Sequence, residues 1–253
     1  MRLRDKVALI TGASGDIGRA ITLRFAQEGA KIIVNFAHDE RRASSLVDEI
    51  RATGRDALAV AADVSSGEQV KRLVEMAINT FGRIDILVNN ASACSITVNQ
   101  SAGVTAEEKL RRLLDVDVKG TFLCCRAITP VMQVQGAGCI INMSWDHAIT
   151  GGMAGTAATM LAAAKGAVHS LSMSLARELA PTIRVNVIAP GWMRDDELSP
   201  QTKSLPEAHQ QTTPLRRLCE PVDVAEAALY LASPDASFVT GQVIMVNGGD
   251  IMY

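Results

Sequence analysis

Short runs of apolar, often β-branched residues alternate along this chain with longer segments of helical periodicity. Seven such runs are predicted to be strands, namely Val7–Thr11, Lys31–Asn35, Ala57–Ala61, Ile86–Asn89, Cys139–Met143, Arg184–Ile188 and Val243–Val246. Several runs are apolar throughout rather than at alternate positions, which is typical of strands covered on both faces. Strands that alternate with helices in this way predict βαβ units and a parallel sheet.

Signals for helix starts lie between these runs. Ser65-x-x-Glu68 fits a capping box, in which a hydroxyl and a carboxylate satisfy N–H groups at the start of a helix. Thr105-x-x-Glu108 fits the same pattern. After the first signal, apolar residues recur at helical spacing: Val70, Leu73, Val74, Ala77, Ile78 and Phe81. They form one stripe, which predicts a helix with one buried face.

No repeat, low-complexity tract or linker interrupts the alternation, so a single domain over residues 1–253 is expected. Two longer irregular segments, Ala91–Val104 and Gly191–Thr213, follow predicted strand ends, where open α/β sheets bind ligands. The second segment is rich in Ser, Pro, Gln and Thr and contains a predicted short helix near Leu205–Gln211. We interpret it as a substrate lid, and a solvated surface loop is the alternative.

Composition narrows the classes of protein that fit the chain. With 48% hydrophobic residues it can bury a large aliphatic core. Its 25 basic and 27 acidic residues leave a net charge of −2 and no basic block, so nucleic acid and anionic membranes are not expected partners. The chain has no membrane-length apolar run and no signal-peptide pattern at its start, so a cytoplasmic location is expected. The five cysteines show no metal-ligand spacing, so free thiols and no metal site are expected.

A glycine-rich turn, TGASGDIG over Thr11–Gly18, follows the first predicted strand and opens the first predicted helix. Such a turn lets backbone N–H groups approach a pyrophosphate at the positive end of a helix. With this turn the sequence resembles the short-chain dehydrogenase/reductase family, whose pattern is TGxxxGxG, and in particular its β-ketoacyl reductase-like branch. The resemblance extends from about Leu3 to Gly249. It implies an α/β fold with a single Rossmann-type, doubly wound, parallel sheet of seven strands and helices on both faces.

Further motifs occur at the family's spacing. Ala62–Val64 matches the contact with the adenine ring, Asn89–Ala91 matches the NNAG motif near the ribose, and Ala189–Gly191 matches the turn beside the nicotinamide. Asn247–Gly249 matches the motif after the last strand. The cofactor-binding residues implied by the resemblance are Gly12, Ser14, Gly15, Ile17, Gly18, Phe36, Asp63, Val64, Asn90, Ala91, Lys165, Pro190 and Gly191.

Two positions in these motifs depart from the family pattern. Asp16 replaces the middle glycine of TGxxxGxG, and its carboxylate would repel a pyrophosphate by roughly 1 kcal/mol in a solvent-like dielectric. Ser92 replaces the last glycine of NNAG. Both changes should lower the affinity for the cofactor without abolishing it.

The choice between the two nicotinamide cofactors is set after the second strand. NAD-dependent members usually place an acidic residue there to hold the ribose 2′-hydroxyl. Here Phe36 occupies that position, and Asn-Phe-Ala is similar to the Asn-Tyr-Ala of many NADPH-dependent members. His38, Arg41 and Arg42 could supply positive charge, although a solvated helix start explains them equally well. NADP(H) is therefore expected in preference to NAD(H).

The family's catalytic tetrad of Asn, Ser, Tyr and Lys is matched only in part. Lys165 matches the lysine, but the tyrosine position four residues earlier is Leu161. Asp117 stands where relatives have the asparagine. Trp145 replaces the second serine of the N-x-S-S pattern, which leaves Ser144, either catalytic or merely structural. We take Lys165, Ser144 and Asp117 as the candidate catalytic residues.

Other side chains could replace the missing phenol as proton donor. Asp146, His147, Thr156 and Thr159 lie between the fifth strand and the helix that carries the lysine. For each of them a role in a surface loop is the alternative. Tyr253, at the end of the chain, could enter a neighbouring subunit's site, since the C-terminus approaches such a site in related tetramers.

Three functions are compatible with this pattern. The leading hypothesis is an NADP(H)-dependent oxidoreductase that reduces an activated C=N, C=C or C=O group of a small hydrophobic metabolite. The alternatives are a catalytically silent dinucleotide-binding protein, acting as scaffold or redox sensor, and a non-redox cyclase or isomerase on the same fold. The expected pocket is apolar, with Met153, Met160, Leu161, Trp192 and Met193 in its wall.

The resemblance also implies a homotetramer. The family's main interface is a four-helix bundle, formed by helices equivalent here to about Ala106–Val134 and Ala157–Leu179. Both segments have more apolar positions than one face of a sheet can cover.

Overall fold

The computed structural model describes residues 1–94, 103–193 and 209–252. One sheet of seven parallel strands forms its centre, in the order β3-β2-β1-β4-β5-β6-β7. The strands are β1 (Val7–Ile10), β2 (Lys31–Phe36), β3 (Ala57–Ala61), β4 (Ile86–Asn89), β5 (Gly138–Met143), β6 (Ile183–Pro190) and β7 (Val243–Val246). All seven predicted strands are present, and the doubly wound sheet is confirmed. The strand order reverses between β1 and β4, where such sheets bind ligands.

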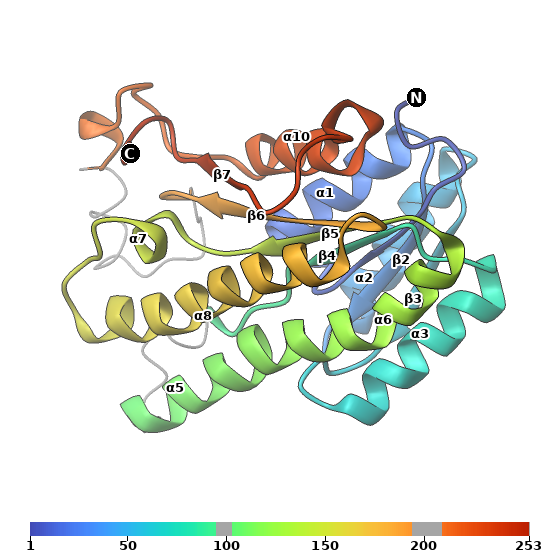
Figure 1. Cartoon of the computed structure of the whole chain (residues 1–253). Coiled ribbons are helices and arrows are strands. Elements are labelled where there is room, and N and C mark those ends of the chain that lie inside the picture. The colour runs from blue at the N-terminus through green and yellow to red at the C-terminus, as the bar shows by residue number, and fades with distance from the viewer. Residues whose placement is uncertain (95–102, 194–208, 253) are drawn as a thin grey trace.

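Helices cover both faces of the sheet (Figure 1). One face is covered by α1 (Asp16–Gln27), α2 (Glu40–Ala52) and α10 (Pro221–Ala232). The other is covered by α3 (Gly67–Phe81), α6 (Thr121–Gln135) and α8 (Thr156–Leu179). The shorter elements are α5 (Ala106–Leu113), η1 (Leu114–Gly120), α7 (Asp146–Ile149) and η2 (Pro234–Ala236). None of the helices in the described ranges is long and apolar enough to cross a membrane.

The apolar strands separate two cores, one on each face of the sheet. Along β1 the side chains alternate, with Ala8 and Ile10 in the core under α1, α2 and α10, and Val7 and Leu9 in the core under α3, α6 and α8. Phe25 of α1 is the largest fully buried side chain. Because burying one large aliphatic or aromatic side chain contributes about 1.5–3 kcal/mol, these two layers supply the main stabilisation of the sheet.

The start of α3 differs from its prediction by one residue. The N-cap of α3 is Ser66, whose side chain accepts from the Gln69 N–H, so the predicted capping box of Ser65 and Glu68 is wrong. The N–H of Ser65 instead donates to Asp63 Oδ1 at 2.8 Å, which turns the chain one residue before the helix. A carboxylate at the end of β3 therefore decides which of two adjacent serines caps the helix.

Only one half of the predicted capping box, the hydroxyl of Thr105, is found at the start of α5. Thr105 is the N-cap, and its Oγ1 accepts from the Glu108 N–H at 3.2 Å. The Glu108 carboxylate does not complete the box, because it binds Arg111 and Arg112. Those two guanidinium groups lower the pKa of Glu108 to about 2.

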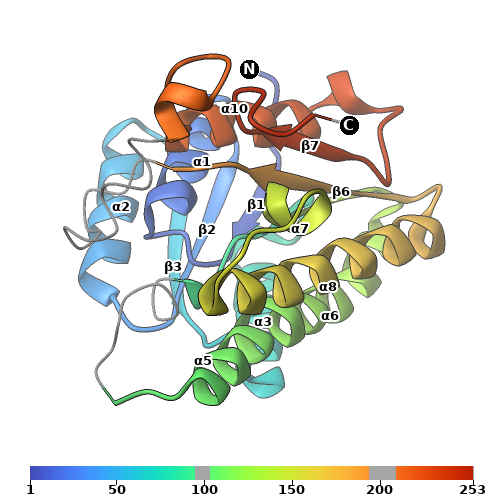
Figure 2. The same ribbon diagram turned by 90° about the vertical axis from the view of Figure 1, so that its left-hand side faces the viewer.

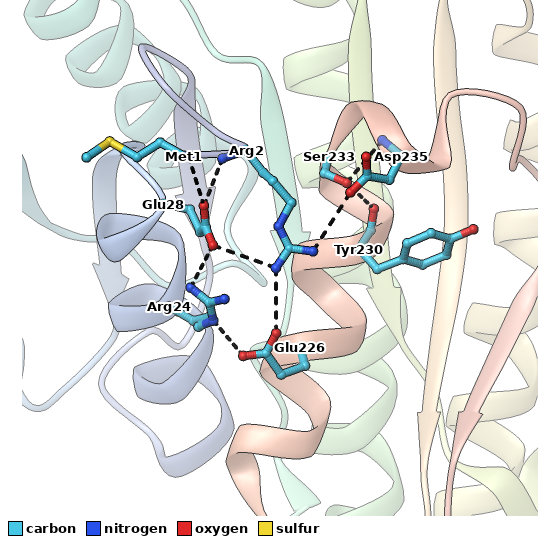
Figure 3. Close-up of polar contacts among 8 residues, drawn as sticks. All are labelled: Met1, Arg2, Arg24, Glu28, Glu226, Tyr230, Ser233 and Asp235. Atoms are coloured by element: carbon cyan, nitrogen blue, oxygen red, sulfur yellow. Dashed lines mark hydrogen bonds and ion pairs between the residues drawn. The ribbon is translucent and has the colours of Figure 1, made fainter.

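An ion-pair network joins the N-terminus to α1 and α10 (Figure 3). Glu28 accepts from the Arg2 N–H at 2.8 Å and pairs with Arg24 at 3.0 Å. The Arg2 hydrogen bond, with help from Arg24, lowers the pKa of Glu28 although burial opposes the shift. Arg24 also pairs with Glu226 of α10 at 2.5 Å, and the Arg2 guanidinium lies between Glu28, Glu226 and Asp235. The network fixes the chain end against the helices that cover this face.

Only part of the expected lid over 191–213 can be compared with the structure. Residues 194–208 lie outside the described residues. The short helix predicted near 205–211 is seen over 209–212, and its earlier residues fall in the part that is not described. A closing role for the segment stays a prediction.

Candidate active site

The residues predicted for the site gather at the carboxyl ends of the strands. This edge of the sheet faces the viewer in Figure 2, where α7 lies between the end of β6 and the first turns of α8. The turns after β1, β3 and β4 form one half of the site. The segments after β5, β6 and β7 form the other half, and Lys165 of α8 lies beneath the end of β5.

Close packing explains two glycines of the turn after β1. Gly12 has a φ of +59°, and a Cβ there would lie 2.9 Å from Ala91 Cα. A Cβ on Gly18 would lie 2.3 Å from the Gly12 carbonyl oxygen. Gly15 differs, because its nearest neighbour would be 3.6 Å away and its φ of −78° is ordinary. Gly12 and Gly18 are therefore required by the fold, whereas Gly15 leaves the mouth of the turn open.

Hydrogen bonds lock this turn onto the segment after β4. Asn90 Nδ2 donates to the carbonyl oxygens of Thr11 and Gly12, at 3.0 Å in both cases. Thr11 Oγ1 accepts from the N–H groups of Asn90 and Ala91, also at 3.0 Å. The predicted cofactor residues on β1 and β4 are thus held together without a ligand.

The N-terminus of α1 suits an anionic group. Its N-cap is Gly15, which offers no side chain to the first-turn N–H groups, whereas side chains cap α2, α3 and α5. Uncapped first-turn N–H groups and the helix dipole favour a phosphate. Ser14 and Ile17 are half-buried beside the turn, and Asp16 is exposed. The residues present therefore fit a pyrophosphate, with Asp16 as an unfavourable charge at its edge.

The ends of β2 and β3 form the adenine side of the predicted site. Phe36 is buried in the core beneath α1 and α2, so no carboxylate stands at that position, and the next acidic residue along the chain, Asp39, caps α2. Asp63 already accepts at Oδ1 from the Ser65 N–H. Val64 is buried and packs so closely on η1 that a Cβ on Gly120 would lie 2.7 Å from its Cγ2.

A buried ion pair lies at the centre of the site. Lys165 Nζ is 2.7 Å from Asp117 Oδ2 and donates to the Met143 carbonyl oxygen at 3.3 Å. Both charged side chains are almost fully buried. Asp117 lies in η1, a π-helical stretch between α5 and α6, and such stretches are frequent at functional sites.

Two departures from the family pattern meet at this pair. Ser92 Oγ donates to Asp117 Oδ2 at 2.6 Å, and the Ala93 N–H donates to Asp117 Oδ1 at 2.9 Å. The Ser92 hydroxyl thus satisfies the Asp117 carboxylate. In the sequence the two positions lie in separate motifs and no local pattern links them. Their contact becomes visible only in the structure.

Ser144 and Leu161 flank Lys165. Ser144 Oγ donates to the Lys165 carbonyl oxygen at 2.9 Å, so its hydroxyl fixes α8 to the end of β5. Leu161 lies one helical turn before Lys165 and packs on a small apolar cluster made of Ala93, Leu113, Met160 and Ala164. The structure thus gives Ser144 a structural bond and puts an alkyl group next to the lysine.

Of the other candidate proton donors, two are brought together. Asp146 Oδ1 accepts from the His147 backbone N–H and lies 2.8 Å from His147 Nδ1. Asp146 Oδ2 accepts from Asn247 Nδ2 at 3.2 Å. Thr156 and Thr159 are exposed at the start of α8.

Tyr253 lies outside the described residues, so its predicted role cannot be compared with the structure.

Close packing beside Asp146 explains Gly191, because a Cβ there would lie 2.6 Å from Asn247 Cβ. Gly191 in turn donates its N–H to the Val246 carbonyl oxygen at 3.0 Å. The Pro190–Gly191 turn and the end of β7 are therefore packed against each other.

A row of aromatic rings lines this half of the site. Trp145 stacks on His147 with 4.9 Å between ring centroids, and His147 meets the edge of Trp192 at 6.4 Å. Trp192 stacks on His209 at 4.4 Å. The sequence predicted Trp192 in an apolar wall and Asn247 in a motif after the last strand, but it gave no sign of His209 as a site residue or of the contact between Asn247 and Asp146. Their partners are distant in the chain, and no local pattern links them.

The cysteine thiols supply no reactive group to this arrangement. All five are free thiols, as expected, and four of them are buried. Burial raises the pKa of Cys125 and of Cys219 to about 12. Burial also raises the pKa of Cys124 and Cys139. None of these four is a reactive thiolate.

Comparison with known proteins agrees with the geometry. A family model described as enoyl-(acyl carrier protein) reductase matches residues 12–250. The chain is 37% identical over 249 residues to a 3-oxoacyl-(acyl-carrier-protein) reductase of Staphylococcus epidermidis, covering 98% of this chain and 100% of that protein. It is 39% identical over 254 residues to the protein of the same name from Thermotoga maritima, covering 98% and 99%.

A solved structure with the same fold is that of a 7α-hydroxysteroid dehydrogenase in complex with NADH and 7-oxoglycochenodeoxycholic acid. The TM-score is 0.88 at 34% sequence identity, and the match covers 100% of this chain and 96% of that one. The chain belongs to the short-chain dehydrogenase/reductase family of dinucleotide-dependent oxidoreductases.

The difference between Gly15 and Gly18 yields a test of the nucleotide site. Gly15→Leu should leave the melting temperature of the free protein unchanged, because its Cβ has space. It should weaken NADPH binding by about tenfold or more, a loss of about 1.4 kcal/mol or more, since the side chain fills the mouth of the turn. Calorimetric titration measures the binding.

Gly18→Ala is the matched control. Its Cβ collides with the turn itself, so it should lower the stability of the free protein by about 1–3 kcal/mol. Wild-type affinity for NADPH in Gly15→Leu would contradict the assignment of this turn.

Proposed function

We propose that this member of the family is an NADP(H)-dependent oxidoreductase that reduces an activated C=N, C=C or C=O group of a small hydrophobic metabolite, using a degenerate form of the family's tetrad. The observation that carries the proposal is the buried ammonium group of Lys165, held by Asp117 and the Met143 carbonyl between the two halves of the site. A buried charge is costly, and this one lies where a nucleotide and a substrate would meet.

Each part of the nucleotide has residues suited to it. We assign the pyrophosphate to the turn after β1 and the first turn of α1, the adenine to the end of β3, and the nicotinamide half to Lys165 and the turn after β6. The residues of this assignment are Gly12, Ser14, Gly15, Ile17, Gly18, Phe36, Asp63, Val64, Asn90, Ala91, Lys165, Pro190 and Gly191. When bound, the nicotinamide supplies or accepts a hydride.

The preference for NADP(H) rests on the end of β2. Phe36 is buried in the core and brings no carboxylate that would repel a 2′-phosphate. His38 and Arg41 are exposed at the start of α2, where they add positive charge. Asp39 works against them, but its carboxylate is engaged as the N-cap of α2 and by the Arg42 guanidinium at 3.4 Å.

The tetrad is degenerate because Leu161 offers no hydroxyl and Ser144 is bonded to the Lys165 carbonyl. The site therefore offers a simple ketone no tyrosine phenol as proton donor. An iminium or activated alkene needs no proton on oxygen when the hydride arrives, and a carbonyl compound needs a substitute donor. The apolar side chains of Met153, Leu161 and Trp192 suit a hydrophobic substrate.

A catalytically silent dinucleotide-binding protein is the second candidate. The engaged Ser144 hydroxyl favours it, because a serine that only anchors α8 performs no chemistry. The Lys165–Asp117 pair favours an enzyme, since a scaffold gains nothing from two buried charges beside the nucleotide. A non-redox cyclase or isomerase stays an alternative that the same assay addresses.

Assays with NADPH and a panel of ketones, aldehydes, imines and activated alkenes test the proposal. We expect the protein to reduce at least one of these classes of compound. The loss of absorbance at the nicotinamide band of NADPH measures the reaction. Leu161→Tyr should raise the rate with simple ketones only slightly, because the Ser144 hydroxyl stays bonded to the Lys165 carbonyl. A protein that binds NADPH tightly and reduces nothing in the panel would favour the silent alternative.

A homotetramer is proposed on the basis of two exposed apolar side chains. Leu114 of η1 is 40% exposed and Phe122 of α6 is 45% exposed, and both lie in the helical run that the resemblance assigns to an interface. Light scattering at micromolar concentration should give four times the mass of the chain. Phe122→Glu should lower that mass, and the equally exposed Met76→Glu on α3 should not. A monomeric wild-type protein would contradict the proposal.

A further inference from the structure

We propose that Asp146 and His147 are the acid–base pair of this site, with His147 as proton donor to the carbonyl oxygen of a ketone or aldehyde and Asp146 as the residue that positions it. The inference rests on the proposed reductase function and narrows its substrate class to carbonyl compounds. It assigns to two adjacent side chains the role for which Leu161 has no suitable group.

The hydrogen bonds of Asp146 define the pair. Its side chain is 0% exposed, its two oxygens accept from the His147 N–H and from Asn247 Nδ2, and its Oδ1 lies 2.8 Å from the His147 ring nitrogen Nδ1. A carboxylate accepts hydrogen bonds and donates none. It therefore fixes the proton of the neutral ring on Nδ1 and leaves Nε2 as the nitrogen that can take or give a proton.

The ring of His147 is held in one orientation and remains reachable. Trp145 covers one face at 4.9 Å with an interplanar angle of 20°, and Trp192 presents its ring at 80°. The His147 side chain keeps 11% of its exposure. Within the described residues Nε2 has no hydrogen-bond partner. A fixed ring with one unbonded nitrogen is the arrangement that proton transfer to a ligand needs.

The pair also lies at the expected place for the chemistry. Ser144, two residues before Asp146, binds the carbonyl oxygen of Lys165 at 2.9 Å. On the other side, a Cβ on Gly191 would lie 3.1 Å from Asp146 Oδ2. Asp146 therefore lies between the backbone of α8 at Lys165 and the Pro190–Gly191 turn, the two elements assigned to the nicotinamide half, and the ring of His147 contacts Trp192, the residue after that turn.

Among the residues that the structure describes, few other titratable groups face the pair. The Lys165–Asp117 ion pair lies on the α8 side, with its charges bonded to each other at 2.7 Å. His209 and Asp250 lie 3.9 Å apart, and the Trp192 ring stands between His209 and His147.

In the described part of the chain, Cys219 is a further titratable group near the pair. Burial, with Asp223 and Asp146 among the smaller contributors, raises its pKa to about 12. The thiol therefore stays protonated over any ordinary assay range. A limb of the rate profile that disappears with the His147 imidazole can then be attributed to that ring.

The reaction step balances with the groups named. As the carbonyl carbon accepts a hydride, the C=O electron pair moves to oxygen, the Nε2–H bond of the His147 imidazolium breaks and an O–H bond forms, which leaves the ring neutral. The carbonyl compound is reduced to an alcohol and the dihydronicotinamide is oxidised. The ring keeps its Nδ1–H bond to Asp146 and regains a proton at Nε2 from solvent.

The first test needs neither cofactor nor substrate. In nucleotide-free protein labelled with ¹⁵N-histidine, the neutral His147 ring should carry its proton on Nδ1. The fraction of that tautomer should fall in Asp146→Asn, which has no charge to hold the ring. A neutral wild-type ring with its proton on Nε2 would overturn the pair, whatever the protein catalyses.

The second test measures carbonyl reduction with NADPH. His147→Gln should lower kcat about 10²- to 10⁴-fold, the usual worth of general acid help, with little change in KM. His147→Ala should be rescued by added imidazole, which a purely structural role would not predict. Asp146→Asn should lower kcat in the same direction. His169→Gln, on α8 and outside the site, should keep the wild-type rate and pH profile.

The outcomes separate this inference from the proposed function. Carbonyl reduction that survives His147→Gln, or that is lost with His209→Gln instead, would leave a reductase and overturn the pair. Reduction of imines or alkenes alone, at a rate that His147→Gln leaves unchanged, would do the same. A wild-type protein that binds NADPH but reduces no compound would overturn the reductase function and the pair together.

Discussion

The buried ion pair between Lys165 and Asp117 is the interaction on which the site depends. It joins α8 to the π-helical stretch η1, and its partners Ser92, Ala93 and Met143 add the segments after β4 and at the end of β5. Two charges out of water are tolerated only when such partners satisfy them, and removing one member of a buried pair costs about 3–5 kcal/mol. The geometry around the lysine is therefore fixed before any ligand arrives.

Two of the residues predicted to depart from the family pattern are each accompanied by a second side chain that offsets the change. The carboxylate of Asp117 is matched by the hydroxyl of Ser92, and the alkyl group of Leu161 is accompanied by an oriented imidazole at His147. The first compensation keeps the charge of the lysine balanced. Under the proposal, the second would supply the proton that the alkyl group of Leu161 cannot. A reductase with an altered site would use both the Ser92–Asp117 contact and the oriented imidazole of His147. A catalytically silent protein would need neither of these two features.

Most of the fold could be predicted from the sequence, because strand periodicity and the glycine turn are local. All seven strands follow from this periodicity, and the turn after β1 lies against the segment after β4, where Asn90 Nδ2 donates to the Gly12 carbonyl oxygen. The cap of α3 was misplaced by one residue, since the competing acceptor Asp63 belongs to a turn that local patterns do not specify. The contacts Asp146–Asn247 and Trp192–His209 could not be predicted, because they depend on how β5, β6 and the C-terminal segment meet in space.

A crystal structure with NADPH bound tests the account most directly. The account predicts that the pyrophosphate lies on the first turn of α1, that Lys165 Nζ contacts the ribose of the nicotinamide half, and that the His147 imidazole faces the space above the nicotinamide ring. A nicotinamide ring bordered by Leu161 alone, with His147 directed away from it, would contradict the account, as would a nucleotide bound elsewhere on the protein.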